Sequence, residues 1–320
     1  MSCFNWAKRW NLDLPIICGI YLAFIPIFSV NLISEIIIFT IYAISYNLLY
    51  GFLGRLSVGH MLFLGAGAYG TAMCCVYVTA NPFVCILAGI VLGTLIAAIL
   101  GPVTVPAAGA AFALVNMAFN QVGFFMIQTG LAVWTGGSDG KSLYFDTVGI
   151  LNCNKPLHVF YLVLACLLVV FFLMRRLLGS PFGVLVRSIK ESDRRANYLG
   201  YNTHNARLIV YIISGGVAAF AGTLYAIMFG YVTPSFIDPT RNIEVIFATL
   251  IGGRGNIYGS LIGGSAFILI KNYLPNVVQR WEMLFGLILL ISVFWFNKGI
   301  TGVYASAKTA LFRLKEKSST

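Results

Sequence analysis

Charged residues are scarce in this sequence. Asp, Glu, Lys and Arg make up 10% of the 320 residues, while hydrophobic residues make up 59%, whereas a typical soluble domain is about 25% charged. The apolar residues form repeated blocks of about 20, each long enough to cross a hydrocarbon core of about 30 Å. This composition excludes an ordinary soluble domain. It predicts an all-α, polytopic membrane protein, because a chain in lipid must satisfy its backbone polar groups internally.

Disulfide and metal-binding patterns are also absent. The seven cysteines include no C-x-x-C pair, and most of them lie inside apolar blocks, where cysteine behaves as a small hydrophobic residue. The three histidines lie far apart in the sequence, and none has a nearby partner pair. The sequence therefore predicts no disulfide framework and no metal site.

Catalytic and nucleotide-binding motifs are missing as well. No H-E-x-x-H, no G-x-S-x-G and no pair of carboxylates occurs within an apolar block. Gly65, Gly67 and Gly70 fit G-x-G-x-x-G, but no strand precedes them, and close contact between helices explains them better. Residues 140–142 resemble the end of a P-loop, except that Thr135 stands where that motif needs glycine. We predict that the chain is not an enzyme and binds no cofactor itself.

Basic residues outnumber acidic ones, and the formal net charge is +11. A nucleic-acid-binding surface would interleave basic residues with exposed aromatic ones, and the sequence has no such stripe. In a polytopic protein, basic residues gather in cytoplasmic loops instead. The ten acidic residues mostly lie in loops or at block ends, and Glu35, Glu244 and Glu282 each stand near the start of a block. A proton- or sodium-driven transporter usually has an ionisable residue deeper in the membrane.

Ten apolar blocks are candidate membrane spans. They cover residues 14–34, 35–53, 58–80, 83–105, 108–133, 157–174, 207–230, 243–252, 258–274 and 283–296. With the N-terminus inside, this alternation places 16 of the 21 Lys and Arg residues on the inner side, as the positive-inside rule requires. We therefore expect about ten transmembrane helices, with residues 1–13 and the basic tail, residues 298–320, both in the cytoplasm.

One block is too short to cross a membrane alone. Ile243–Gly252 has about half the length that a spanning helix needs, so it is either tilted, or re-entrant and buried among other helices. Glycines follow it on both sides of Arg254 and permit tight turns. The sequence predicts a short broken or re-entrant helix near residues 243–259, an arrangement found beside transport pathways.

The segment Ser180–Gly200 holds a large share of the charge between two long apolar blocks. It reads SPFGVLVRSIKESDRRANYLG and has a broken apolar stripe at helical spacing. A charged amphipathic segment between spans lies in water, and its Arg and Lys residues place it on the cytoplasmic side. It either docks a partner or only sets the topology. We favour docking, because topology needs charge but no apolar stripe.

Four segments carry a family resemblance. They read YNLLYGFLGRLSVGHMLFLGAGAYGTA (Tyr46–Ala72), AFALVNMAFNQ with WTGGSDG (Ala111–Gly140), SPFGVLVRSIKESDRRANYLGYN (Ser180–Asn202) and the run Ser214–Gly302, which includes EVIFATLIGGRGNIYGSLIGG and FNKGITG. In order and spacing they resemble the permease subunits of ABC importers for branched-chain amino acids, the LivM-like branch. The likeness covers most of the chain after Tyr46.

The resemblance implies a complex in the bacterial inner membrane. Its partners would be a second, LivH-like permease subunit in a hetero- or homodimer, two cytosolic ABC ATPases that bind ATP and Mg²⁺, and a periplasmic substrate-binding protein. Such partners would explain why this chain has no Walker A lysine of its own. Residues 14–297 would form the permease domain, with residues 175–206 as a cytoplasmic coupling segment.

The resemblance also implies a coupling role for part of Ser180–Gly200. Importer permeases present a helix with an E-A-A-x-x-x-G pattern to the ATPase; here Ala196 and Gly200 keep the Ala-x-x-x-Gly spacing, and the acidic residue is displaced. The expected ATPase contacts are Glu191, Asp193, Arg194, Arg195, Ala196, Leu199 and Gly200.

Polar residues within spans are candidates for the substrate path. Asn116 and Asn120 share a helix face near the middle of a span, and Gln121 follows them. Ser57 and His60 are expected to begin the third span near the cytoplasmic surface. An amide in hydrocarbon must find a partner, so it either joins neighbouring helices or lines a watered pathway.

The external loop WTGGSDG is a candidate docking site for the binding protein. Its residues Gly136, Gly137, Ser138 and Asp139 are equally well explained by turn chemistry. Branched-chain amino acids are the default substrate, while similar permeases serve urea, amides, other amino acids or aromatic acids. The alternative function is a self-sufficient secondary transporter or channel for a small solute.

Overall fold

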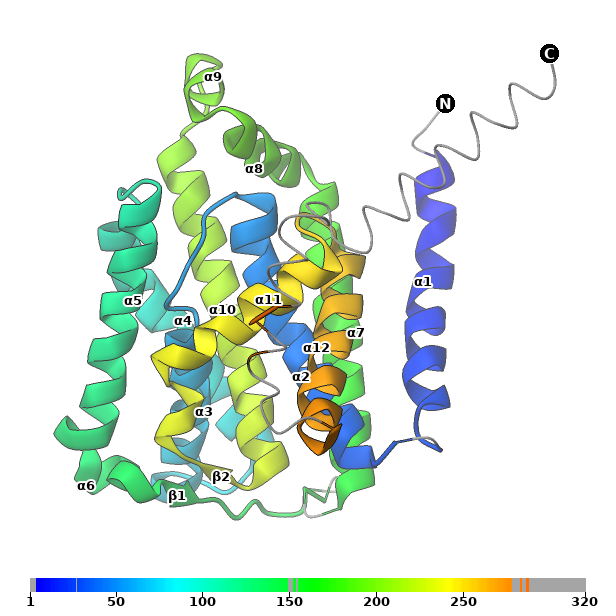
Figure 1. Cartoon of the computed structure of the whole chain (residues 1–320), viewed down its shortest axis with the longest axis vertical. Coiled ribbons are helices and arrows are strands. Elements are labelled where there is room, and N and C mark those ends of the chain that lie inside the picture. Colours follow the sequence, from blue (N-terminus) through cyan, green and yellow to red (C-terminus); the bar gives the residue numbers. More distant parts are fainter. Residues whose placement is uncertain are drawn as a thin grey trace.

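The computed structural model describes residues 4–26, 28–148, 152–153 and 155–277, together with Met283, Gly286 and Leu287. Within these residues the regular secondary structure is helical apart from one two-stranded ribbon (Figure 1). The predicted all-α class is therefore confirmed in this part of the chain. The expected last span, residues 283–296, lies outside the described residues except for those three positions, and the basic tail lies wholly outside them.

The elements follow the chain in a simple order. The helices are α1 (Phe4–Ala23), α2 (Val30–Asn47), α3 (Met61–Tyr77), α4 (Pro82–Thr104), α5 (Ala110–Phe125), α6 (Ala132–Thr135), α7 (Pro156–Gly179), α8 (Pro181–Glu191), α9 (Asp193–Tyr198), α10 (Thr203–Phe229), α11 (Asn242–Gly252) and α12 (Ile257–Val277). Strand β1 (Lys141–Ser142) pairs antiparallel with β2 (Tyr231–Val232). Short π-helical turns, Leu48–Phe52 and Met126–Gly130, extend α2 and α5.

Five helical stretches in the described residues are long and apolar enough to cross a membrane. They are Val30–Phe52, Pro82–Thr104, Ala110–Gly130, Pro156–Gly179 and Thr203–Phe229. The apolar part of α1 and all of α3 are shorter, and α11 has only 11 residues. The protein is therefore a polytopic membrane protein that mixes spanning helices with short ones.

The boundary between the first two helices lies at a different place from the one that the sequence suggested. The sequence suggested a break between Ser34 and Glu35, but α1 ends at Ala23 and both residues lie inside α2. Pro26 in the intervening turn cannot continue a helix, and the Ser29 hydroxyl accepts a hydrogen bond from the Leu32 amide as the N-cap of α2. Hydrophobicity alone did not reveal this boundary, because the blocks on both sides are apolar.

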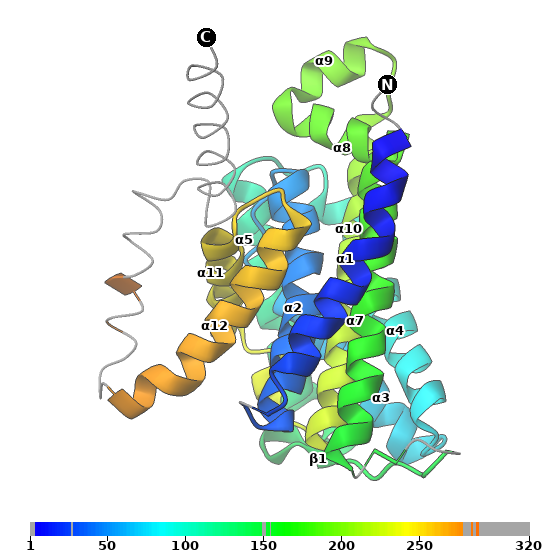
Figure 2. The same ribbon diagram turned by 90° about the vertical axis from the view of Figure 1, so that its right-hand side faces the viewer.

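Small residues let α3, α4 and α10 approach closely, as the glycine pattern predicted. A side chain at Gly67 of α3 would overlap the backbone of Ala219 in α10, and one at Gly93 of α4 would overlap the Ala219 side chain. A side chain at Gly222 would likewise meet the backbone of Leu64. Figure 2 shows α2 among the other helices of the bundle, and its side chains are buried along almost all of its length.

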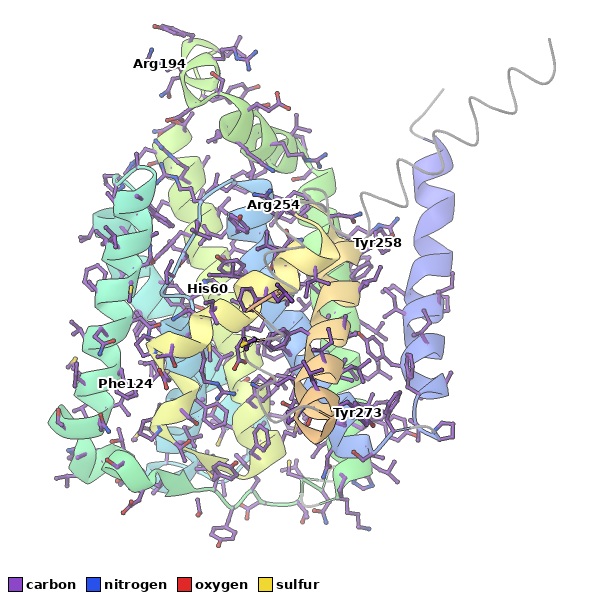
Figure 3. The ribbon with its side chains drawn as sticks, in the orientation of Figure 1. His60, Phe124, Arg194, Arg254, Tyr258 and Tyr273 are labelled. Carbon is purple, nitrogen blue, oxygen red and sulfur yellow. The ribbon has the colours of Figure 1, made fainter. Side chains whose placement is uncertain are left out.

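Two short helices begin inside the bundle. The chain leaves α2, runs through an irregular segment and starts α3 just after His60, which lies about halfway between the two ends of the bundle (Figure 3). Helix α11 likewise starts within the bundle, and the Asn242 side-chain oxygen accepts a hydrogen bond from the Met61 amide at 2.8 Å. The N-terminal ends of α3 and α11 therefore meet in the interior.

The two ends of the molecule differ. Helices α8 and α9 project beyond the bundle at one end, whereas α6 and the β1–β2 ribbon close the other (Figure 1). The beginning of α1 lies at the same end as α8 and α9 (Figure 2). This arrangement agrees with the expectation that the N-terminal region and the charged segment share one side of the membrane.

Candidate functional site

The charged segment forms two helices rather than one. The Ser180 hydroxyl caps α8 by accepting from the Gly183 amide, and Pro181 occupies the first turn, where its missing N–H costs nothing. Ser192 then ends α8 and caps α9, accepting from the Arg195 amide. The two serines thus fold Ser180–Gly200 into a helical hairpin.

Helix α9 is fixed to the bundle by its buried face. Asp193 forms an ion pair with Arg207 of α10 at 3.2 Å, and Ala196 is 2% exposed. Gly200 ends the segment with a φ of +87°, a left-handed conformation that glycine adopts without strain. Ala196 and Gly200 therefore hold α9 in place rather than presenting side chains outward.

The outer face of the hairpin is both apolar and basic. Tyr198 is 88% exposed and Leu199 76%, and Arg194 lies at the tip of the molecule (Figure 3). A groove of about 610 Å³ runs between α8 and α9, with Glu191 and Arg195 on its walls. Exposed aromatic and aliphatic side chains beside arginines are typical of a protein-binding surface.

The inner face of α8 is tied to the membrane part by Lys190. Its ammonium group donates to the Gly51 carbonyl at 2.6 Å, in the π-helical turn that follows α2. Burial and then the nearby Arg254 lower the pKa of Lys190 from its ordinary value. A partly desolvated charge makes a stronger hydrogen bond than an exposed one, so Lys190 is a firm link between α8 and α2.

The same turn also holds the loop between α11 and α12. The Asn47 side chain donates to the Asn256 carbonyl and to the Ser260 hydroxyl, both at 2.8 Å, and accepts from the Gly255 amide. Arg254 lies over the ring of Tyr50 and donates to its hydroxyl at 3.0 Å. The charged hairpin, the end of α2 and the α11–α12 turn are therefore one connected unit.

The amides of α5 are engaged in contacts between helices. Tyr211 of α10 donates to Asn116 at 2.7 Å. Asn120 donates to the Ile237 carbonyl at 2.7 Å and accepts from Asn242 at 2.6 Å. Both amides are buried, whereas Gln121 is exposed on another face of α5. The geometry favours interhelical hydrogen bonding for Asn116 and Asn120.

His60 and Ser57 lie deep in the bundle rather than near one surface. The His60 ring contacts Tyr42, Tyr46 and Phe63, with centroid distances between 5.4 and 5.6 Å, and its Nε2 is 3.0 Å from the Ser45 hydroxyl. Ser57 is fully buried, and its carbonyl accepts from Tyr46. The expected position near the cytoplasmic surface is wrong, because the segment before α3 runs inward.

A small charged cavity lies between α2, α10, α11 and α12. It has a volume of about 170 Å³, and its walls include the carboxylates of Glu35 and Glu244 and the cationic groups of Arg241 and Lys271. Lys271 contacts both Glu244 oxygens, at 2.8 and 2.9 Å, and Arg241 lies 3.3 Å from one of them. None of the five polar residues expected on the substrate path lines this cavity.

The glycine-rich loop at the opposite end is a sequence of tight turns. Gly136, Gly137 and Gly140 all have positive φ values, and the Thr135 hydroxyl holds the turn by donating to the Ile127 carbonyl at 2.7 Å. Ser138 and Asp139 are exposed between them. The glycines of WTGGSDG therefore permit the tight turns of the backbone, and the side chains of Ser138 and Asp139 are exposed to the surroundings.

Comparison with known proteins identifies the family. A family model described as branched-chain amino acid transport system / permease component matches residues 28–294. The chain belongs to this permease family. It is 23% identical to the LivM permease protein of the high-affinity branched-chain amino acid transport system of Salmonella typhimurium, covering 85% of this chain and 69% of that protein.

Further relatives show how broad the family is. The permease is 24% identical to a probable branched-chain amino acid transport permease protein LivM of Methanocaldococcus jannaschii, covering 86% of this chain and 90% of that protein. It is also 26% identical to the ribose import permease protein RbsC of Haemophilus influenzae, covering 74% of this chain and 75% of that protein. No solved structure matches it. The family consists of transport permeases, so this permease is not an enzyme.

Sequence reasoning overlooked the charged cavity of this permease. The sequence placed Glu244 near the start of a short block and Lys271 within the block 258–274, and the structure places them in α11 and α12 accordingly. It gave no sign that α11 begins within the bundle, where these two residues and Arg241 meet. The available signal was the presence of four charged residues, Glu35, Arg241, Glu244 and Lys271, in or directly beside otherwise apolar helices. Charges in such helices occur where they pair or face a polar cavity.

Proposed function

We propose that this permease is the transmembrane subunit of an ABC importer that carries branched-chain amino acids, or a related small polar solute, across the bacterial inner membrane. ATP hydrolysis in partner subunits drives it. The observation that carries the proposal is the helical hairpin α8–α9, which presents an apolar and basic surface at one end and is bonded to the transmembrane helices on its inner side.

The hairpin suits mechanical coupling. Rigid-body movement of a docked ATPase reaches the transmembrane helices only through stiff contacts, and the Lys190–Gly51 and Asp193–Arg207 contacts supply two of them. Arg194, Arg195 and Leu199 are proposed to touch the ATPase, with Glu191 at the edge of the groove. Ala196, Asp193 and Gly200 are proposed to keep the surface in shape.

The orientation follows from the position of this surface. The hairpin and the beginning of α1 share one end, and the hairpin is rich in Arg and Lys, so we place this end in the cytoplasm. The C-terminal tail is proposed to lie on the same side, and the full chain to have about ten spans. Ser138 and Asp139, at the opposite end, are then available to a periplasmic binding protein.

The complex is proposed to hold two permease subunits, two ABC ATPases and a substrate-binding protein. The relatives named above include a branched-chain amino acid permease and a ribose permease. Both of these substrates are small polar solutes, which supports a substrate of this class for this permease. In this picture the binding protein supplies most of the selectivity, and the permease provides a weak, transient site.

A secondary transporter is the second candidate, favoured by one observation. Glu35, Glu244 and Lys271 are ionisable residues within the transmembrane bundle, and ion-driven transporters use such residues. A secondary transporter would work as this chain alone and would follow an ion gradient.

The first experiment is affinity purification of this chain from its native membrane in mild detergent. A second permease subunit and P-loop ATPases should accompany it. An oligomer of this polypeptide alone would contradict the importer proposal and favour the secondary transporter.

Gly200→Leu forces a branched side chain into a left-handed conformation and should weaken ATPase association while membrane insertion persists. Gly200→Asn is the matched control, because asparagine tolerates that conformation.

A further inference from the structure

We infer that the charged cavity is a binding site for a zwitterion, a molecule that carries both an ammonium group and a carboxylate next to an apolar side chain. The inference rests on the proposed function and deepens it by assigning the substrate site to this cavity and by naming the residues that would receive each charged group. The site consists of Glu35, Glu244, Arg241 and Lys271 with the aromatic walls around them.

The four charged side chains differ in how many ion-pair partners they have. Glu244 is saturated, because Lys271 contacts both of its oxygens and Arg241 approaches one of them through Nε. Arg241 also donates through Nη1 to the Ser235 carbonyl. Glu35, in contrast, forms no ion pair with any residue that the structure describes. The cavity therefore holds an acceptor for an ammonium group beside a fixed cluster of positive charge.

The internal cluster explains how both signs can coexist in an apolar bundle. Isolated charges are costly to bury, whereas two carboxylates and two cations within one cavity compensate one another. A zwitterion entering the cavity adds no net charge and offers one partner of each sign. A simple anion or cation would leave the cavity with an uncompensated charge.

The remaining walls are apolar and aromatic. They include Phe39 and Tyr42 of α2, Tyr225 and Phe229 of α10, and Phe236. The volume of about 170 Å³ is below the range of about 300–1,000 Å³ typical of drug-sized ligands, so it suits one small metabolite. An aliphatic side chain gains from these walls by leaving water.

The backbone supports the carboxylate end of such a ligand. The N-termini of α3 and α11 meet beside the cavity, and Met61, Arg241 and Glu244 from these ends line it. Helix N-termini carry partial positive charge and favour anions, and discontinuous helices use them in this way in other transporters. A neutral sugar or urea brings no carboxylate to this field and no ammonium group to the carboxylate of Glu35.

The test measures access to the cavity directly and needs no binding protein. Ser235 is an exposed wall residue, so Ser235→Cys places a thiol at the cavity. The rate of its modification by N-ethylmaleimide is followed by intact mass in right-side-out membrane vesicles that contain both permease subunits and the ATPases. The chain with its native cysteines alone gives the background.

L-Leucine should slow the modification of this thiol in proportion to occupancy, about tenfold at ten times its Kd. Leucinol, which lacks the carboxylate, 4-methylpentanoate, which lacks the amine, and D-ribose and urea should leave the rate unchanged. Equal protection by D-ribose, urea or leucinol would overturn the inference, and so would the absence of any protection by L-leucine.

A second variant tests the residue that receives the ammonium group. Glu35→Gln in the Ser235→Cys background should abolish protection by L-leucine, whereas Asp146→Asn, an exposed carboxylate on a loop, should preserve it. Persistent protection in Glu35→Gln contradicts the assignment. ATPase association is measured on the same preparations. Lost association would reject the proposed function, whereas retained association without leucine protection rejects only the zwitterion site.

Discussion

Individual buried polar residues join the helices of this permease. Asn120 is the best example, because it contacts both the segment before α11 and the first residue of α11 through Ile237 and Asn242. Asn242 in turn holds the first amide of α3. One chain of hydrogen bonds thus connects α5, α11 and α3 where the two short helices begin.

Replacement of Asn120 by leucine should therefore reduce stability. The change leaves the Ile237 carbonyl and the Asn242 amide without this partner, and a buried unsatisfied group costs about 1–3 kcal/mol. Gln121→Leu, on an exposed face of the same helix, is the matched control and should be close to neutral. Thermal unfolding of the detergent-solubilised complex measures both. Unchanged stability in Asn120→Leu, with transport lost, would restore the substrate path as the role of Asn120.

Arg55 shows that a residue with no assigned purpose in the sequence can be structural. It donates to the carbonyls of Val105 and Ala107 at the end of α4 and lies over the ring of Phe112. A cation at a helix C-terminus is stabilising because it meets unpaired carbonyl groups. Arg55 thereby anchors the irregular segment that leads into α3.

Helix α8 is the element that joins the projecting hairpin to the transmembrane part. Its Lys190 is bonded to the π-helical turn after α2, and Asn47, the last residue of α2 before that turn, is bonded to the α11–α12 loop. Helices α2 and α11 both reach the charged cavity. A displacement of α8 therefore has a short, bonded route to the proposed substrate site.

Lys190→Met should separate ATP hydrolysis from transport. A hydrogen bond from a charged donor contributes about 1.5–3 kcal/mol, so uptake should fall about tenfold or more if the bond forms in only one transport state. ATPase subunits should still co-purify, because the exposed face of α9 is unchanged. Arg176→Met, an exposed cation near the end of α7, is the control. If ATP hydrolysis and uptake stay fully coupled in Lys190→Met, the Lys190–Gly51 bond is not the route by which α8 acts on the transmembrane helices.

The whole molecule is polarised between its two ends. The α8–α9 hairpin is basic and apolar, whereas the opposite end has glycine turns held by hydrogen bonds, including the Lys141 contacts to Tyr77 and the Trp134 carbonyl. This polarity is the basis of the proposed orientation.

Single cysteines at the two ends test this orientation. Arg194→Cys should react with a membrane-impermeant thiol reagent only from the cytoplasmic side, and Asp139→Cys only from the periplasmic side. Intact and permeabilised cells distinguish the two cases. Reaction of both cysteines from the same side would contradict the topology, and reversed reactivity would place the ATPase surface outside the cell.

Composition and periodicity determined the class of this protein. Long apolar blocks must become helices in lipid, and the charged amphipathic stretch must leave it, so the bundle, the short helix near Ile243 and the projecting segment were all predictable. The small-residue contacts among α3, α4 and α10 were also predictable, because glycines at regular spacing allow backbones to approach.

Only the tertiary structure decided where polar side chains meet. Hydrophobicity locates a residue along its helix, and it placed Glu244 correctly in the first turn of α11. It does not show whether a helix starts at a surface or within the bundle, so it did not reveal how deeply Glu244 and His60 lie. Nor does it reveal partners: Glu244 and Lys271 are 27 residues apart and become neighbours only through the α11–α12 turn. The charged cavity exists because charges from three separate segments, at Glu35, at Arg241 with Glu244 and at Lys271, come together around one space. That meeting is a property of the folded bundle.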